Sequence, residues 1–153
     1  MFREGTHGRL YQKFGCQLGD GMAVFSVWAP NAESVSVIGD FNQWRPDANV
    51  ARPRSDGTGI WQVEIPGVEH GHKYKFAIRS RSGELLEKAD PFARYAELAP
   101  NTGSIVWRDS EYDWQDADWM ANRPEHNGLA SPMSVYEVHL GSWKRDANGE
   151  MLG

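Results

Sequence analysis

The sequence predicts an all-β chain: an immunoglobulin-like antiparallel β-sandwich over residues 1–107, a linker over residues 108–133, and one further strand within residues 134–153. Short apolar or alternating runs, rich in valine, phenylalanine and isoleucine, recur up to Trp107. Turn-forming residues separate these runs every several positions, and no segment of this part has a convincing helical period. The pattern leaves the order of the strands open.

The first two strands are predicted at residues 22–28 and 34–38, on either side of the turn-like sequence Ala-Pro-Asn-Ala at 29–32. The polar, irregular residues 41–59 then predict a long exposed loop.

The next two strands alternate cleanly. In residues 60–65, Trp61, Val63 and Ile65 share one face, and Pro66-Gly67 ends the run. In residues 73–79 the side chains expected to point inward are Tyr74, Phe76 and Ile78, and those expected to point outward are Lys73, Lys75, Ala77 and Arg79. Strand alternation also assigns Trp28, Trp61 and Phe76 to the core.

The remaining strands are short, and the linker is acidic. Leu85 and Leu86 favour a hairpin with the preceding strand, and residues 104–107 one more strand. The linker's carboxylates have no rigid element to pair them and are interpreted as solvated. They are Glu111, Asp113, Asp116 and Asp118. Trp114 and Trp119 are expected to anchor this linker.

Composition narrows the class of protein. The formal net charge of −5 disfavours nucleic acid and anionic membranes as partners. A single cysteine, Cys16, excludes an intrachain disulfide and suits a reducing cytoplasm, and no apolar run predicts a signal peptide or a membrane span. His70 and His72 lack further ligands at a suitable spacing, so we expect no metal and no cofactor.

Trp44 and Lys75 are the candidate ligand contacts. A sugar ring presents a face of C–H groups that packs on an indole, ringed by hydroxyls that need donors and acceptors. Trp44 stands among polar loop residues, and Lys75 projects from the outer face of a strand. The alternatives are a loop anchor for Trp44 and an ordinary solubilising lysine for Lys75.

Three stretches resemble 1,4-α-glucan branching enzymes of glycoside hydrolase family 13. They are Trp28–Ala32 with Val35–Trp44, Tyr74–Phe76 with Ala89–Pro91, and Tyr136–Trp143. The first two are similar to a family 48 carbohydrate-binding module, a sandwich shared by branching and debranching enzymes. The third is similar to the first strand and following loop of a branching enzyme's catalytic (β/α)₈ barrel, and is the more specific of the three.

The resemblance implies the non-catalytic N-terminal portion of a branching enzyme of glycogen biosynthesis. The parent would cut α-1,4 links and rejoin the freed end through α-1,6 bonds. A barrel takes roughly 250 residues, so residues 134–153 would be the start of a truncated one. The carboxylates of retaining transfer would lie beyond Gly153, which leaves no catalytic residue here and implies no activity for the chain alone. Glu137 and His139 have at most a supporting role.

The resemblance also implies a glucan-binding surface that includes Trp44 and Lys75, with Asn42 and Asn101 as polar contacts. Leu85 stands where relatives carry a second stacking tryptophan, and Val106 stands near an expected asparagine. Binding should therefore be weak, between millimolar and high micromolar, or about 4 to 7 kcal/mol. The expected partners are α-glucan and the missing barrel. The alternative is a purely structural brace for that barrel, with no sugar binding.

Overall fold

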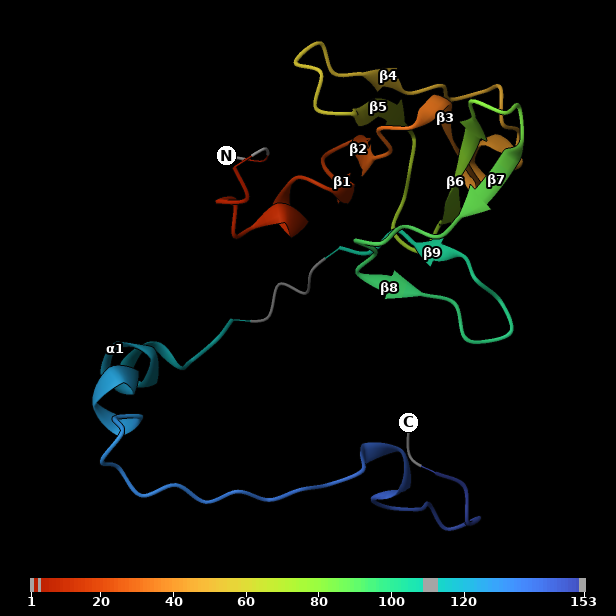
Figure 1. The fold of residues 1–153 in the computed structure, drawn as a ribbon. Coiled ribbons are helices and arrows are strands. Elements are labelled where there is room, and N and C mark those ends of the chain that lie inside the picture. The colour runs from red at the N-terminus through yellow and green to blue at the C-terminus, as the bar shows by residue number, and fades with distance from the viewer. Residues whose placement is uncertain (1, 3, 109–112, 152–153) are drawn as a thin grey trace. The chain divides into compact units, whose positions relative to one another are not determined.

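The computed structural model describes residues 2, 4–108 and 113–151 and divides the chain into two units, Met1–Ser110 and Glu111–Gly153. The first unit contains nearly all of the regular structure (Figure 1). Its elements are η1 (Leu10–Gln12), β1 (Gly15–Leu18), β2 (Met22–Trp28), β3 (Ala32–Gly39), η2 (Asp40–Asn42), β4 (Arg52–Pro53), β5 (Ile60–Pro66), β6 (Lys73–Ser80), β7 (Leu85–Lys88), β8 (Tyr95–Ala96) and β9 (Ser104–Ile105).

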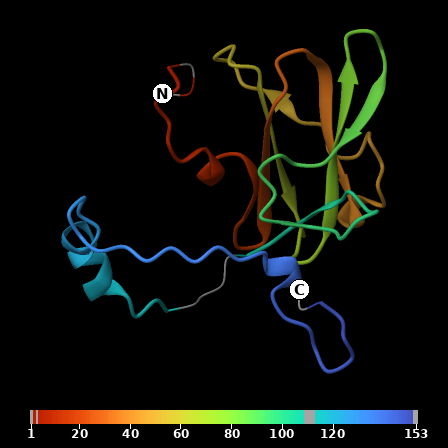
Figure 2. The ribbon, with the colours of Figure 1, turned by 60° about the horizontal axis from the view of Figure 1, so that its bottom comes forward.

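The strands of the first unit form two antiparallel sheets, which confirms the predicted sandwich (Figure 2). One sheet has the order β1-β2-β5-β4. The other has the order β3-β6-β9-β8, with β7 also paired to β6. Consecutive strands β2 and β3 lie in different sheets, so the pairings that hold each sheet join segments far apart in sequence, such as β3 with β6.

The core is built by alternation in β2, β3, β5 and β6. Phe25, Val37, Tyr74 and Phe76 are almost fully buried, and the Phe25 and Tyr74 rings meet edge to face at 5.0 Å. The expected inward face of β6 is confirmed, except that Ala77, expected outside, is buried as well.

Trp28 was expected in the core, and this prediction is wrong. Its side chain is 55% exposed, because alternation in β2 turns Phe25 and Val27 inward and leaves Trp28 on the outer side. The Trp28 indole N–H donates to the Thr58 carbonyl at 3.0 Å. Trp61 is half-buried and donates to the Ala29 carbonyl, also at 3.0 Å.

A buried polar pair ties the second sheet to the segment after β7. The Tyr74 hydroxyl donates to the Asp90 carboxylate at 2.5 Å, and the Phe92 N–H donates to the same carboxylate at 2.8 Å. Burial raises the pKa of Asp90, and these two hydrogen bonds oppose the rise. Burial also raises the pKa of the Cys16 thiol to about 12, so Cys16 behaves as a small core residue.

The second unit contains an α-helix, which the sequence did not predict. Helix α1 (Ala117–His126) lies in the stretch expected to be a linker, and none of its residues is buried. Trp119 stacks on His126 within the helix at 5.5 Å. Asp113, Asp116 and Asp118 lie on exposed or half-exposed backbone, while Glu111 lies outside the described residues.

The strand expected within residues 134–140 is not confirmed. Residues 132–139 form no strand, and η3 (Leu140–Ser142) follows. The side chains of Val135 and Tyr136 are 80% and 75% exposed. A strand needs a partner for its N–H and C=O groups, and no partner for this segment is found among the described residues.

Within residues 2, 4–108 and 113–151, no helix has the length and apolar character that crossing a membrane requires.

Candidate functional site

The outer face of the five-stranded sheet carries the candidate site. Figure 1 shows β6 between β3 and β7, and the register places the outward residues of these strands side by side. Ile38 pairs with Lys75, Ser36 with Ala77, and Arg79 with Leu85. The loop after β3 borders this face, because Ser36 also bridges to Val50.

Trp44 is held in a backbone conformation that bulky residues rarely adopt. Gln43 and Trp44 both have positive φ, 57° and 59°, in the left-handed region. Such residues cost about 1–3 kcal/mol each and persist only where the surroundings enforce them. Here the Trp44 N–H donates to the Gly39 carbonyl at 3.0 Å. Trp44 as a whole remains 37% exposed, so the loop leaves this large residue partly open to solvent instead of burying it.

Asp40 orients the Trp44 ring. One carboxylate oxygen accepts from the Trp44 indole N–H at 3.1 Å, and the other accepts from the backbone N–H of Lys73 at 2.8 Å. The indole is thereby fastened to the first residue of β6. Gly39 allows the end of β3 to lie close to Lys73, because a Cβ at this position would collide with the Lys73 carbonyl oxygen and the Phe41 ring.

Lys75 lies two residues further along β6, on the same outward face as Lys73. Its side chain is half-buried, and its ammonium makes no hydrogen bond or ion pair with any residue in the described ranges. Its neighbour Lys73 is occupied, since Lys73 Nζ lies 2.7 Å from Glu97 Oε1. Lys75 thus keeps all the donors of its ammonium available on this face.

The loop that carries Asn101 is tied to the same end of β6. Glu97 Oε2 accepts from the Gly103 N–H at 3.0 Å, and the Glu97 N–H donates to the Gly103 carbonyl at 2.9 Å. Because Glu97 also pairs with Lys73, these bonds close the loop and fix its base. The hydrogen bond and charge of Lys73 lower the pKa of Glu97. The Asn101 side chain is exposed.

Asn42, unlike Asn101, is buried. It is only 8% exposed, and its side-chain amide makes hydrogen bonds within the loop. Its N–H groups donate to the Val37 carbonyl at 2.8 Å and to Asn49 Oδ1 at 2.7 Å, and its oxygen accepts from the Gly39 N–H at 2.9 Å. We therefore assign Asn42 to support of the loop rather than to ligand contact.

Two positions reduce the site. Leu85 is 44% exposed and stands opposite Arg79 on the outward face, where it offers an apolar surface but no ring. Val106 is fully buried and points into the core, so it adds nothing to the outer face. Trp44 is thus the aromatic ring that this arrangement offers to a ligand.

Asp40, Lys73 and Glu97 were not singled out from the sequence. They hold the contact residues in place through pairings between segments up to 33 residues apart. One signal was available: an aspartate four residues before a loop tryptophan can accept from the indole N–H. The role of Glu97 had no sequence signal, because only the tertiary fold brings it to Lys73.

The described ranges contain no candidate metal site. No group of three or more histidine, cysteine, aspartate or glutamate side chains there could hold a metal ion. His70 packs on Trp107 at 4.4 Å and accepts from the Arg108 N–H, and His72 accepts from the Glu69 N–H. His139 hydrogen-bonds Ser142 at 2.8 Å in an exposed segment.

The two antiparallel sheets place this chain in the class of immunoglobulin-like β-sandwich domains, here with Trp44 and Lys75 displayed on one face. The chain belongs to the family of carbohydrate-binding module 48 (isoamylase N-terminal domain), whose model matches residues 13–93.

Curated relatives extend the likeness over the full chain. The chain is 56% identical over 153 residues to the 1,4-alpha-glucan branching enzyme GlgB of Aromatoleum aromaticum, and covers 100% of itself and 24% of that protein. It is 52% identical over 147 residues to the GlgB of Albidiferax ferrireducens, covering 95% of itself and 23% of the relative. The match falls on their N-terminal region, so the chain spans about a quarter of the length of these relatives.

Solved structures agree on the fold. Pullulanase type I from Bacillus subtilis, solved with maltose, matches with a TM-score of 0.56 at 24% identity, over 67% of this chain and 14% of that one. A Klebsiella pneumoniae pullulanase with maltotriose matches with a TM-score of 0.52 at 25% identity, over 63% and 10%.

Proposed function

We propose that this chain binds α-glucan through the outer face of the five-stranded sheet and serves as the non-catalytic N-terminal portion of a 1,4-α-glucan branching enzyme. The observation that carries the binding role is the Trp44 indole, held out by a left-handed backbone and by Asp40. A strained conformation that exposes a large ring is hard to explain by packing alone. Its use as a stacking platform for a glucose ring explains it.

Trp44, Lys75 and Asn101 each have a role in this proposal. The Trp44 ring stacks on the apolar face of a glucose unit, and the Lys75 ammonium donates to its hydroxyls. Asn101 adds an amide from the loop whose base Glu97 fixes. With a single aromatic ring, and with Leu85 in place of a second one on the same face, we expect weak binding, which suits a module that works through many repeated glucose units.

Co-sedimentation of the 153-residue chain with glycogen tests the proposal. Wild type should be retained, and Trp44→Ala should lose most of that retention. Lys75→Ala should lower it by a factor of about three to ten, as expected for a charged donor to neutral hydroxyls. Trp119→Ala removes an exposed tryptophan from α1 and is the matched control, which should behave as wild type.

The second candidate is a structural brace for a catalytic domain, with no sugar binding. Leu85 and Val106 favour it, because both remove ligand contacts from the face. No retention of the wild type, or equal retention of Trp44→Ala, would support the brace and exclude the binding role of this face.

The activity of the longer enzyme, α-1,4 to α-1,6 chain transfer, is part of the same proposal. It rests on the 56% identity to a protein named as a branching enzyme. The iodine-staining spectrum of amylose incubated with the chain alone should stay unchanged, and a shift typical of branching would contradict the non-catalytic assignment.

A further inference from the structure

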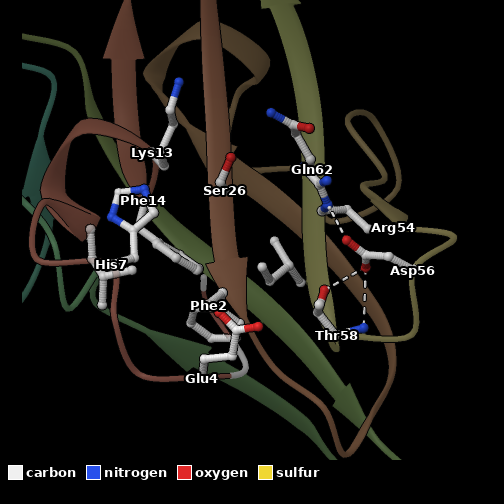
Figure 3. Close-up of a pocket in the computed structure, with 12 residues that line it drawn as sticks. Phe2, Glu4, His7, Lys13, Phe14, Ser26, Arg54, Asp56, Thr58 and Gln62 are labelled. Carbon is white, nitrogen blue, oxygen red and sulfur yellow. Dashed lines mark hydrogen bonds and ion pairs between the residues drawn. The ribbon is translucent and has the colours of Figure 1, made fainter.

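A pocket lies on the opposite side of the sandwich, on the outer face of the β1-β2-β5-β4 sheet (Figure 3). Its volume is about 520 Å³, within the usual range of small-molecule sites. The floor is formed by outward residues of β2 and β5. One wall is the N-terminal segment that leads into β1, and the other is the turn before β5, with Asp56 and Thr58.

The floor of the pocket contains polar groups without protein partners. Ser26 and Gln62 are directly paired across β2 and β5 and therefore point to the same side. Ser26 is only 3% exposed as a residue, and neither its hydroxyl nor the Gln62 amide makes a hydrogen bond within the described residues. Because no fully buried side-chain nitrogen or oxygen in the described residues lacks a partner, the Ser26 hydroxyl reaches the surface of the pocket, where a ligand can bond it.

Apolar rings stand beside these groups. Phe2 and Phe14 contact each other at a centroid distance of 5.4 Å and line the pocket together with Ile60. In Figure 3, Lys13, Ser26 and Gln62 lie toward one end, Phe2 and Glu4 lie toward the other, and Phe14 lies beside Lys13 and Ser26. The pocket thus offers a ligand both aromatic surface and hydrogen-bonding groups.

The charges around the pocket balance. Lys13 and Arg54 bring two positive charges, and Glu4 and Asp56 bring two negative ones. Arg54 lies 3.0 Å from Asp56, and hydrogen bonds from Thr58 lower the pKa of Asp56 to about 2, so that pair stays ionised. A charged ligand gains little here, whereas a neutral one with hydroxyl groups fits both the charge and the unpaired groups.

We propose that this pocket is a second contact site for a neutral pyranose ring, on the sheet opposite Trp44. The ring's C–H face would pack on Phe2 and Phe14, and its hydroxyls would bond Ser26 and Gln62. This site uses residues distinct from those of the first face, so a longer glucan could engage both sides of the module.

Nuclear magnetic resonance titration of the Trp44→Ala chain with maltotriose isolates this site. The backbone amides of Ser26 and Ile60 and the side-chain amide of Gln62 should shift saturably at millimolar concentrations. Gln62→Leu should weaken this response about five- to tenfold. Ser26→Ala, which removes one oxygen, should weaken it as well and serves if Gln62→Leu does not fold. Glu64→Gln, outward on the same strand but outside the pocket, should leave it unchanged.

The outcomes separate this inference from the proposed function. In the wild-type chain, shifts confined to Trp44 and Lys75 would overturn the second site and keep the first. Shifts at Ser26 and Gln62 without a response of Trp44 would do the reverse. Equal shifts with sorbitol, an open-chain polyol without a ring face, would also overturn the pyranose site.

Discussion

Asp40 shows how one residue can set the geometry of the proposed binding face. Its two carboxylate oxygens join the Trp44 indole to the backbone of Lys73, so a loop side chain and a strand share one anchor. Because Asp40 is exposed, its main contribution is to orientation rather than to stability.

Asp40→Ala should therefore weaken glycogen binding about three- to tenfold while the fold persists. The indole would lose its hydrogen bond and rotate away from the stacking position. Glycogen co-sedimentation measures the loss, and thermal unfolding checks the fold. Asp47→Ala, an exposed carboxylate of the same loop, is the control, and an equal loss there would contradict the orienting role of Asp40.

Tyr74 carries a different kind of dependence, because its hydroxyl satisfies a buried carboxylate. Tyr74→Phe should lower the free energy of unfolding by about 1–3 kcal/mol, the cost of leaving a buried acceptor short of a partner. Urea denaturation measures this. Tyr11→Phe, at a ring that is 55% exposed, should change stability by less than about 0.5 kcal/mol.

Asp90 should make stability depend on pH. Burial raises its pKa in the folded chain above the ordinary value of 3.8. The stability that Asp90 contributes by holding its proton in the folded chain is therefore fully present below pH 3.8. This stability is lost as the pH rises toward the pKa of Asp90 in the folded chain. The stability of wild type relative to Asp90→Asn should fall as pH rises above about 4 and then level off. Denaturation midpoints across this range test it, and a difference that grows with pH would contradict it.

At the scale of elements, the loop between β8 and β9 depends on one side chain. Glu97 accepts from the Gly103 N–H and pairs with Lys73, while the pair itself is partly exposed. Exposed ion pairs contribute little to global stability. The pair should therefore govern the order of the loop, and with it the position of Asn101, more than the unfolding transition.

Glu97→Ala should speed hydrogen exchange of the Gly103 amide and leave β2 and β5 protected. The same loss should appear in wild type as the pH falls, because Lys73 lowers the pKa of Glu97 and the pair breaks when pH drops through that value. Exchange measured by nuclear magnetic resonance tests both. Unchanged protection of the Gly103 amide in the variant would show that Glu97 does not hold the loop.

Strands could be predicted from the sequence where apolar and polar residues alternate and the apolar face is buried, as in β5 and β6. The strand predicted within residues 134–140 was not found, because valine and tyrosine favour a strand only when another strand pairs with them. Helix α1 was missed because Pro124 and a polar sequence hide its period. The residue types indicate only a local preference for strand or helix, and pairing with another strand decides whether a strand forms.

For the whole molecule, stability should differ between the two units. The sandwich buries a continuous core, whereas α1 has ten residues and none of them buried. Isolated helices of that length are marginal in water.

Amides of α1 should consequently exchange orders of magnitude faster than those of Phe25, Val37 and Phe76. Native-state hydrogen exchange followed by mass spectrometry measures this for the intact chain. Protection of α1 equal to that of β6 would contradict the expected difference and would require packing of the helix that its exposure does not provide.

The sequence by itself determined the class of fold, the inward faces of β5 and β6, and the family to which the chain belongs, because alternation and turn residues are local and the motifs are written in the chain. It also singled out Trp44 and Lys75. Only the tertiary structure decided that Asn42 supports the loop and that Glu97 fixes the base of the loop that carries Asn101. The physical reason is that these roles depend on hydrogen bonds and an ion pair that exist only in the folded arrangement, whereas strand alternation and residue spacing are local.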